Sequence, residues 1–236
     1  MQSLQIIRGR KFQIFLQWLF FGTIMKKLLF TFFSFALATN LIRANENVTL
    51  KSNAMEQAFM IQQAIQMENE DFFFPRSIQL DLLKNCPQVI PTLAQWVYEE
   101  WHPYDTSLTK EKLVRSFQTR LNTHAIPITF VVLKDDLPIG VISLKKETAP
   151  EFADFPENAI WMGSLQVVPE ERNQGLGQEL LKFLQTVAGQ FGYEKLYFYT
   201  SNPANVKWYL KRSAQVIEER FFRGHTITIM AIPLKS

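Results

Sequence analysis

From Ser77 onward, the apolar and polar residues of this chain follow two alternating periodicities. Alternating apolar and polar positions are typical of half-buried strands, whereas apolar residues three or four positions apart are typical of amphipathic helices. The pattern predicts strands at residues 77–83, 159–168 and 195–201 and two-stranded hairpins at residues 128–146 and 214–234. It predicts helices at residues 89–101, 107–121, 178–192 and 205–213. A strand-helix-strand unit flanked by hairpins indicates an α/β protein with a mixed sheet and helices on its faces.

Single residues support these boundaries. Pro91 is expected in the first turn of its helix, where the missing N–H costs nothing, and Ser107 or Thr109 is expected to cap the next helix. The sequence Asp-Asp-Leu-Pro at residues 135–138 is typical of a hairpin turn. Residues 159–168 are almost continuously apolar, which predicts a strand that is buried on both faces.

The N-terminal part of the chain has a different pattern. Two apolar runs, at residues 12–25 and 28–42, are separated by two lysines. A membrane span needs about 20 apolar residues, and each run is shorter than that. The stretch from Met25 has the basic start, short apolar middle and small residues of a secretory signal peptide. A signal peptide, a membrane anchor and sequence upstream of a later start codon are three alternative interpretations.

These patterns divide the chain into three parts. Residues 1–45 form the hydrophobic signal-like or anchor segment, which a wrongly assigned start codon would also explain. Residues 46–75 form a polar linker, and the apolar spacing at residues 54–70 indicates a short peripheral helix within it. Residues 76–236 form the globular domain.

Composition and charge exclude several classes of function. Apolar residues make up 47% of the 236 residues and charged residues 20%, as in an ordinary globular protein. The net charge of +3 hides an excess of positive charge in residues 1–54, so the remainder is slightly negative and no nucleic-acid partner is expected. The only cysteine, Cys86, excludes an intrachain disulfide and is interpreted as a buried structural residue. With three scattered histidines, no metal site is expected.

The clearest motif follows the apolar strand at residues 159–168. Arg172 to Gly177 has the form R-x-x-G-x-G and opens the helix predicted at residues 178–192. Glycine destabilises regular structure, so two glycines at a helix start indicate that a ligand approaches the backbone there. The unpaired amides and positive end of a helix N-terminus favour an anion. The spacing differs from the G-x-G-x-x-G and G-K-[ST] nucleotide motifs.

The chain resembles the GNAT-type N-acetyltransferases over residues 78–234. The segment SLQVVPEERNQGLGQELL resembles the loop and helix that hold the diphosphate of acetyl-CoA, and YFYTSNPANVKWYLKRSAQVIEE resembles the later strand, Asn-containing turn and Tyr-bearing helix. The order of elements and the ending FRGHTITIM are also similar to the family. The resemblance implies the GNAT fold at residues 76–236, with a mostly antiparallel sheet, one splayed parallel pair and helices on both faces.

The resemblance also implies the site. Tyr209 stands at the position of the acid that protonates the leaving CoA thiolate, and the Val167 amide is expected to polarise the thioester carbonyl. Acetyl-CoA is the expected co-substrate, with no metal. The residues expected to bind it are Leu165, Val167, Val168, Arg172, Asn173, Gln174, Gly175, Leu176, Gly177, Gln178, Asn202 and Asn205.

Two departures from the family pattern concern the turn after the last helix and the general base. Ser213 stands where relatives usually have glycine, so the turn after residues 205–213 is expected to differ. The strand at residues 159–168 has no carboxylate, although many relatives carry a glutamate there to accept the proton of the amine. The candidate bases are Glu99, Glu100, Glu147, Asp154 and His225, and the sequence does not select one of them.

The predicted function is transfer of an acetyl group from acetyl-CoA to a primary amine, directly within a ternary complex. Aromatic and acidic residues at 96–105 suit a cationic small molecule with an apolar body; they are Trp96, Tyr98, Glu99, Glu100, Trp101, Tyr104 and Asp105. The alternatives are a protein or peptide N-acetyltransferase and a CoA-binding module without catalysis. A cytoplasmic catalytic domain is expected, as a monomer or homodimer, with membrane association through residues 12–42 or export by a signal peptide as open alternatives.

Overall fold

The computed structural model describes residues 54–66, 77–147 and 149–234. The hydrophobic segment, with the expectations for residues 12–42, and most of the linker lie outside these ranges. Residues 54–66 are helical, in the segment whose spacing indicated a short helix, and three of their apolar side chains are buried. In the described ranges, no helix is both long and apolar enough to cross a membrane.

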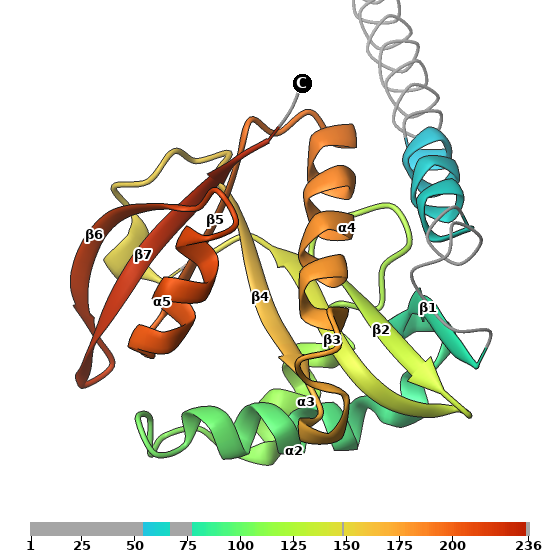
Figure 1. Ribbon diagram of the computed structural model, residues 1–236, viewed down its shortest axis with the longest axis horizontal. Coiled ribbons are helices and arrows are strands. Elements are labelled where there is room, and N and C mark those ends of the chain that lie inside the picture. The colour runs from blue at the N-terminus through green and yellow to red at the C-terminus, as the bar shows by residue number, and fades with distance from the viewer. Residues whose placement is uncertain (1–53, 67–76, 148, 235–236) are drawn as a thin grey trace, which may run out of the picture. The chain divides into compact units, whose positions relative to one another are not determined.

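A seven-stranded sheet forms the centre of the domain (Figure 1), in the order β1-β2-β3-β4-β5-β7-β6. Neighbouring strands are antiparallel except for the parallel pair β4–β5, which confirms the predicted mixed, mostly antiparallel sheet. The strands are β1 (Ile78–Leu82), β2 (Ile128–Lys134), β3 (Leu137–Lys145), β4 (Ile160–Val167), β5 (Lys195–Thr200), β6 (Gln215–Phe222) and β7 (His225–Pro233).

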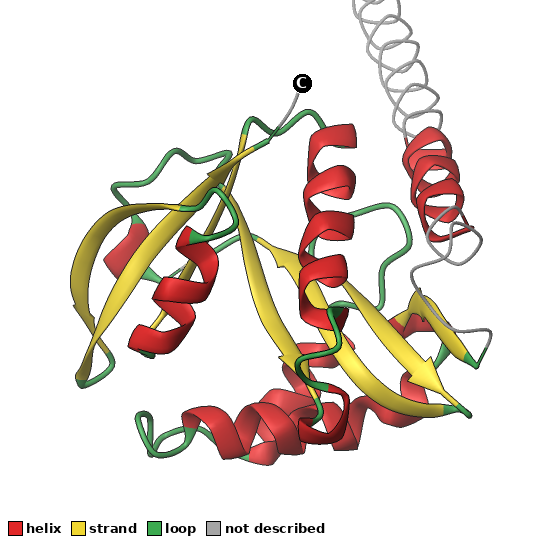
Figure 2. Ribbon diagram, in the orientation of Figure 1, coloured by secondary structure: helices red, strands yellow, loops and turns green. Residues whose placement is uncertain are grey.

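The four predicted helices are present (Figure 2) as α2 (Ile90–Trp101), α3 (Lys110–Gln118), α4 (Leu176–Gln190) and α5 (Pro203–Leu210). Pro91 lies in the first turn of α2, and the Thr109 side chain caps α3 by accepting from the Lys112 amide at 3.2 Å. Both α4 and α5 begin two residues before their predicted starts, because Gly175 and Asn202 take the N-cap positions.

The hydrophobic core has a part on each face of the sheet, and alternate residues of a strand pack into different parts. Ile160 and Met162 of β4 pack in the same cluster as the apolar face of α4, whereas Trp161 packs in an aromatic cluster with Phe152 and Phe222. On β2 and β3, Val131 and Val141 pack with α2 and α3. Helices therefore cover both faces of the sheet, as predicted, because the side chains of successive strand residues point to opposite faces.

The parallel pair β4–β5 separates after its first residues. The two strands pair only at Ile160 with Leu196 and at Trp161 with Tyr197, and from Met162 onward β4 continues without β5 beside it. The second half of β4 is consequently half-buried, so the predicted burial on both faces holds only for its first residues. The separation leaves backbone groups of β4 free to pair with something other than a strand.

A β-bulge bends β4 at the same point. Gly163 pairs with Ser143 and Gln166 with Val141, so two residues of β4 oppose the single Ile142 of β3. Ser164, one of the two, has a φ of 56°, a left-handed conformation that is uncommon for residues other than glycine. Bulges of this kind redirect side chains near functional sites.

Candidate active site

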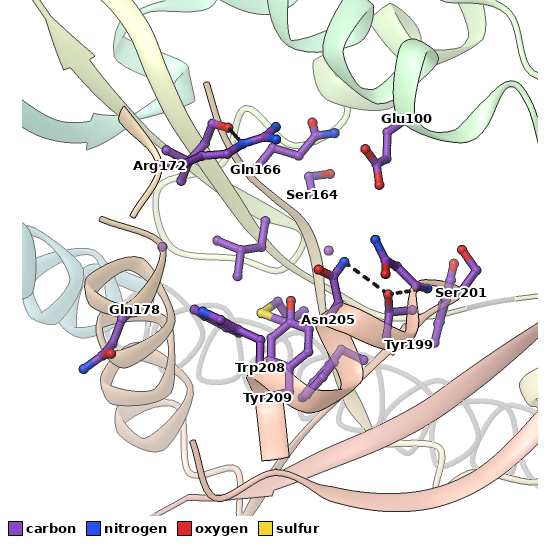
Figure 3. A pocket seen from close by; sticks show the side chains of 18 of the residues that line it. Glu100, Ser164, Gln166, Arg172, Gln178, Tyr199, Ser201, Asn205, Trp208 and Tyr209 are labelled. Atoms are coloured by element: carbon purple, nitrogen blue, oxygen red, sulfur yellow. Dashed lines mark hydrogen bonds between the residues drawn. The ribbon is translucent and has the colours of Figure 1, made fainter. Parts of the chain in front are cut away.

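A pocket of about 800 Å³ lies where β4 and β5 separate. Figure 3 shows side chains from both strands, from the start of α4 and from α5 around this space, with Glu100 at one end. Of the residues predicted to bind the cofactor, the pocket is lined by Leu165, Val167, Arg172, Asn173, Gly175, Gly177, Gln178, Asn202 and Asn205. Tyr209 also lines it. The structure thus brings together most of the predicted site.

Three predicted cofactor residues do not line the pocket. The Val168 amide donates to the Ile139 carbonyl at 3.0 Å, and the Gln174 amide side chain donates to the Glu170 carbonyl at 3.0 Å. The Leu176 side chain is buried in the core. Only the backbone of Gln174 and Leu176 remains available to a ligand.

The loop before α4 presents a row of free backbone amides. In the described structure, the five N–H groups from Asn173 to Gly177 have no hydrogen-bond acceptor, whereas those of Gln178 and Glu179 bond to the Gly175 carbonyl. Asn173 has a φ of 61° and Gly175 a φ of 93°, and such left-handed residues curve successive amides into an anion-binding nest. The nest lies at the positive end of a 15-residue helix, so it suits a diphosphate.

The two glycines of the motif have different roles. Gly175 is required by its φ of 93°, which L side chains rarely adopt. Gly177 has no such requirement, but a Cβ there would lie 3.8 Å from Val167 Cγ2 and 3.9 Å from Trp208 Cζ2. A side chain at Gly177 would therefore fill the space between β4 and α5. Both observations fit a coenzyme A group held against the backbone.

The backbone of β4 offers a further contact. Because Gly140 pairs with Val167 and the Val168 amide points to β3, the N–H and C=O of Val167 point to the opposite side. That side faces the space that β5 has left. The Val167 carbonyl accepts from Arg172 Nε at 2.8 Å, so Arg172 also fixes the loop, and the Val167 amide is left for a ligand.

Tyr209 projects from α5 into the pocket. Its ring packs against Phe198 and Trp208, with centroid distances of 4.4 and 4.9 Å, and its hydroxyl points into the open space (Figure 3). Burial raises the pKa of Tyr209 above its ordinary value of 10.0, so the hydroxyl stays protonated at neutral pH and can donate a proton.

The turn after α5 supports Tyr209. Ser213, where the family usually has glycine, has a φ of 64°, and the Ala214 amide donates to the Tyr209 carbonyl at 3.2 Å. This serine thus adopts the left-handed conformation that favours glycine.

Trp208 and Arg212 are pocket residues that the sequence analysis missed. The Arg212 guanidinium lies 3.7 Å from the Trp208 ring centroid and donates to the Trp208 carbonyl and, at 3.0 Å, to Gln178 Oε1. Trp208 lies in α5 and Arg212 in the turn after it. In the helix predicted at residues 205–213 the two are four positions apart, and this i, i+4 spacing was the available signal, since such side chains share one helix face.

Asn202 and Asn205 have structural contacts as well as pocket positions. Asn202 Oδ1 accepts from the Ala204 amide at 2.9 Å and caps α5. Asn205 Nδ2 donates to Thr200 Oγ1 at 3.4 Å. The Asn202 backbone amide also donates to Thr200 Oγ1, at 3.2 Å, so both residues hold the end of β5 to the start of α5.

The end of the pocket away from Tyr209 and α5 is lined by Glu100, Trp101 and Tyr104. The other members of this aromatic and acidic segment do not line it: Trp96, Tyr98, Glu99 and Asp105. Asp105 instead pairs with Arg223 in the turn between β6 and β7, at 3.2 Å. This ion pair joins the loop after α2, which carries the pocket residue Tyr104, to the β6–β7 turn.

Among the candidate bases, Glu100 alone lines the pocket. Glu147 pairs with Lys145 at 2.7 Å and Asp154 with Arg220 at 2.7 Å. Glu99 accepts from Gln95, and His225 packs against Tyr104. In the described residues, no cluster of three or more His, Cys, Asp or Glu could hold a metal ion.

Cys86 lies away from this chemistry. Its side chain is buried with α2 and α3, and burial, with a smaller effect from Asp81, raises the pKa of the thiol to about 11. A thiol with this pKa is a poor nucleophile at neutral pH.

Comparison with known proteins gives the family. The sequence model of the Acetyltransferase (GNAT) family matches residues 90–213, just over half of the chain, whereas no curated protein sequence matches it. Among solved structures, aminoglycoside 6'-acetyltransferase type Ii is similar over 66% of this chain and 97% of its own, with 14% identity and a TM-score of 0.52. An N-acetyltransferase from Staphylococcus aureus Mu50 covers 67% of this chain and 99% of its own, with 18% identity and a TM-score of 0.51.

The two structures show the shared fold, and the family model spans the elements from α2 to the turn after α5, including the amide nest and Tyr209. The chain therefore belongs to the Acetyltransferase (GNAT) family and is an acyltransferase.

Proposed function

We propose that this protein transfers an acetyl group from acetyl-CoA to a primary amine of a small molecule, within a ternary complex. The observation that carries the proposal is the amide nest at Asn173–Gly177, which opens onto the gap between β4 and β5 and faces Tyr209 across it. A diphosphate suits the nest, and an extended arm suits the free edge of β4.

The residues of the pocket have complementary tasks. The nest binds the diphosphate, and Gly177 leaves room for it beside Val167 and Trp208. Arg212 adds a positive charge next to Gln178. The Val167 amide hydrogen-bonds the thioester carbonyl oxygen, on which negative charge develops as the amine attacks.

Proton transfers complete the reaction. Glu100, at the acceptor end of the pocket, accepts a proton from the ammonium group, directly or through water. The amine nitrogen then forms the C–N bond as the C–S bond breaks. The departing thiolate takes the Tyr209 hydroxyl proton, and the tyrosinate regains a proton from the newly acylated nitrogen through water. The amide product and CoA thiol then leave.

The test is calorimetric titration of acetyl-CoA into the full chain and into Gly177→Val. Valine would occupy the space between Val167 and Trp208, so we expect binding to weaken by about 100-fold or more. Gly177→Ala adds only a methyl group and should weaken binding less. Thr186→Val, at an exposed position of the same helix, is the matched control and should bind like the wild type.

Release of free thiol with a panel of amines tests the reaction itself. Turnover with small amines would support the proposal over a peptide acceptor. Binding of acetyl-CoA without turnover of any amine or peptide would favour the CoA-binding module without catalysis. Folded wild-type protein that binds no acetyl-CoA would contradict the proposal altogether.

A further inference from the structure

A half-buried arginine behind the acceptor end of the pocket is held by hydroxyl groups. Arg120, just after α3, donates through Nη1 to Ser143 Oγ at 3.3 Å and Ser164 Oγ at 3.1 Å, and through Nη2 to Ser116 Oγ at 2.8 Å. In the described residues, it forms no ion pair. Burial lowers the pKa of Arg120, and the charge of Glu147 opposes that effect. Because Arg120 is partly withdrawn from water, a nearby anion would stabilise its charge.

One of the three hydroxyls connects Arg120 to the pocket. Ser164 lies at the β4 bulge and lines the pocket, and Figure 3 shows it at the same end as Glu100. Because Ser164 Oγ accepts from Arg120, its own hydrogen is available to another acceptor. The bulge and the φ of 56° at Ser164 thus present a hydroxyl donor, polarised by a cation, to a ligand.

The remaining charges at this end are paired. Lys145 pairs with Glu147, and Arg223 pairs with Asp105. At this end of the pocket, two charged residues of the described part of the chain have no ion pair. Arg120 lies behind Ser164, and Glu100 lines the pocket. Two unpaired charges of opposite sign match a ligand that carries both an ammonium group and an anion.

We propose that the acceptor is an amine that also carries a carboxylate, and that Ser164 selects it by donating a hydrogen bond to that carboxylate. Arg120 is a positioning residue that acts through Ser164: it holds the hydroxyl and its charge stabilises the bound carboxylate. Glu100 faces the ammonium group. This inference rests on the proposed acetyl transfer and narrows its substrate class.

The experiment compares matched acceptors that differ only at the carboxyl group. Phenylalanine, phenylalaninamide and phenethylamine, and the equivalent leucine series, are assayed by thiol release with the full chain. A hydrogen bond to a charged group contributes enough to predict a kcat/KM at least about tenfold higher for each acid than for its decarboxylated amine. A wild-type enzyme that turns over the amines or the amides as well as the acids would overturn the proposal.

Two variants test the residues. Ser164→Gly removes the hydroxyl at a φ that glycine favours, and Arg120→Lys keeps the charge but loses the three-way contact with the hydroxyls. Both should bring the acid-to-amine ratio of kcat/KM toward one. Ser201→Ala removes a pocket hydroxyl that does not contact Arg120 and should leave the ratio as it is. An unchanged ratio in both Ser164→Gly and Arg120→Lys would also overturn the proposal.

Binding keeps this inference separate from the proposed function. Phenylalanine and phenethylamine are titrated into protein saturated with CoA, which requires no turnover. Tighter binding of phenylalanine, lost in Ser164→Gly, would support the carboxylate site even if no acetyl transfer occurred. Equal binding of the two would contradict it even in an active acetyltransferase.

Discussion

At the scale of single residues, the same side chain has different chemistry according to what surrounds it. Tyr209 is buried between Phe198 and Trp208, and the loss of hydration disfavours its phenolate. The hydroxyl therefore keeps its proton at pH values at which an exposed tyrosine begins to lose it. The same effect makes Cys86 unreactive, since burial disfavours the thiolate.

We expect Tyr209→Phe to lower kcat by roughly 100-fold, the typical contribution of a general acid, with little change in the affinity for acetyl-CoA. Because the pKa of Tyr209 is raised, its protonated form persists to higher pH. The wild-type rate should thus rise with pH as the amine loses its proton and show no decline due to Tyr209 below about pH 10. Initial rates between pH 6 and 10 measure both effects, and an unaltered kcat in Tyr209→Phe would exclude the acid role.

At the scale of elements, the ends of helices carry both stability and function. The start of α4 leaves its amides unpaired for a ligand, whereas the start of α5 is capped by Asn202. The sequence analysis assigned both segments to the cofactor, because the Asn-containing turn and R-x-x-G-x-G both resemble segments where the family binds it. The structure distinguishes them by where their hydrogen bonds go.

The cap predicts a stability effect for Asn202. Asn202→Ala should reduce the free energy of unfolding by about 1 kcal/mol, because the Ala204 amide loses its acceptor. Asn202→Ser can still cap and should restore most of this loss. Urea denaturation of both variants measures the difference. If both bind acetyl-CoA as the wild type does, Asn202 has only the capping role.

At the scale of the whole domain, contacts between distant segments hold together the surroundings of the pocket. Arg223 and Asp105 are 118 residues apart in sequence, yet their ion pair joins the loop after α2 to the β6–β7 turn. Arg120 and Ser164 come together in the same way, from the turn after α3 and from β4. Such pairs exist only where the folded sheet places the two segments beside each other.

The Asp105 contact predicts a dependence of stability on acid. The hydrogen bond from Ser107 and, to a smaller extent, the charge of Arg223 lower the pKa of Asp105 from 3.8. The ionised Asp105 carboxylate therefore adds to the free energy of unfolding at pH values above its ordinary pKa. This contribution is lost as the pH falls through the lowered pKa of the folded protein. Asp105→Asn should be less stable than the wild type by at most about 1 kcal/mol at neutral pH. Thermal unfolding at successive pH values should show this gap closing in acid; a gap that is constant from pH 7 to pH 2 would contradict the assignment.

The sequence by itself determined the elements, their order and the loop at residues 172–177, and the resemblance to the GNAT family pointed to Tyr209. These depend on local periodicity, on the backbone freedom of glycine and on a motif whose spacing lies within one segment. Only the tertiary structure decided which of several acids lines the pocket and that Arg120 lies behind Ser164. It also decided that Gly177 leaves space for a ligand, whereas Gly175 allows a left-handed backbone conformation. The physical reason is that burial, pairing of charges and the separation of β4 from β5 depend on distances between segments that sequence order does not specify.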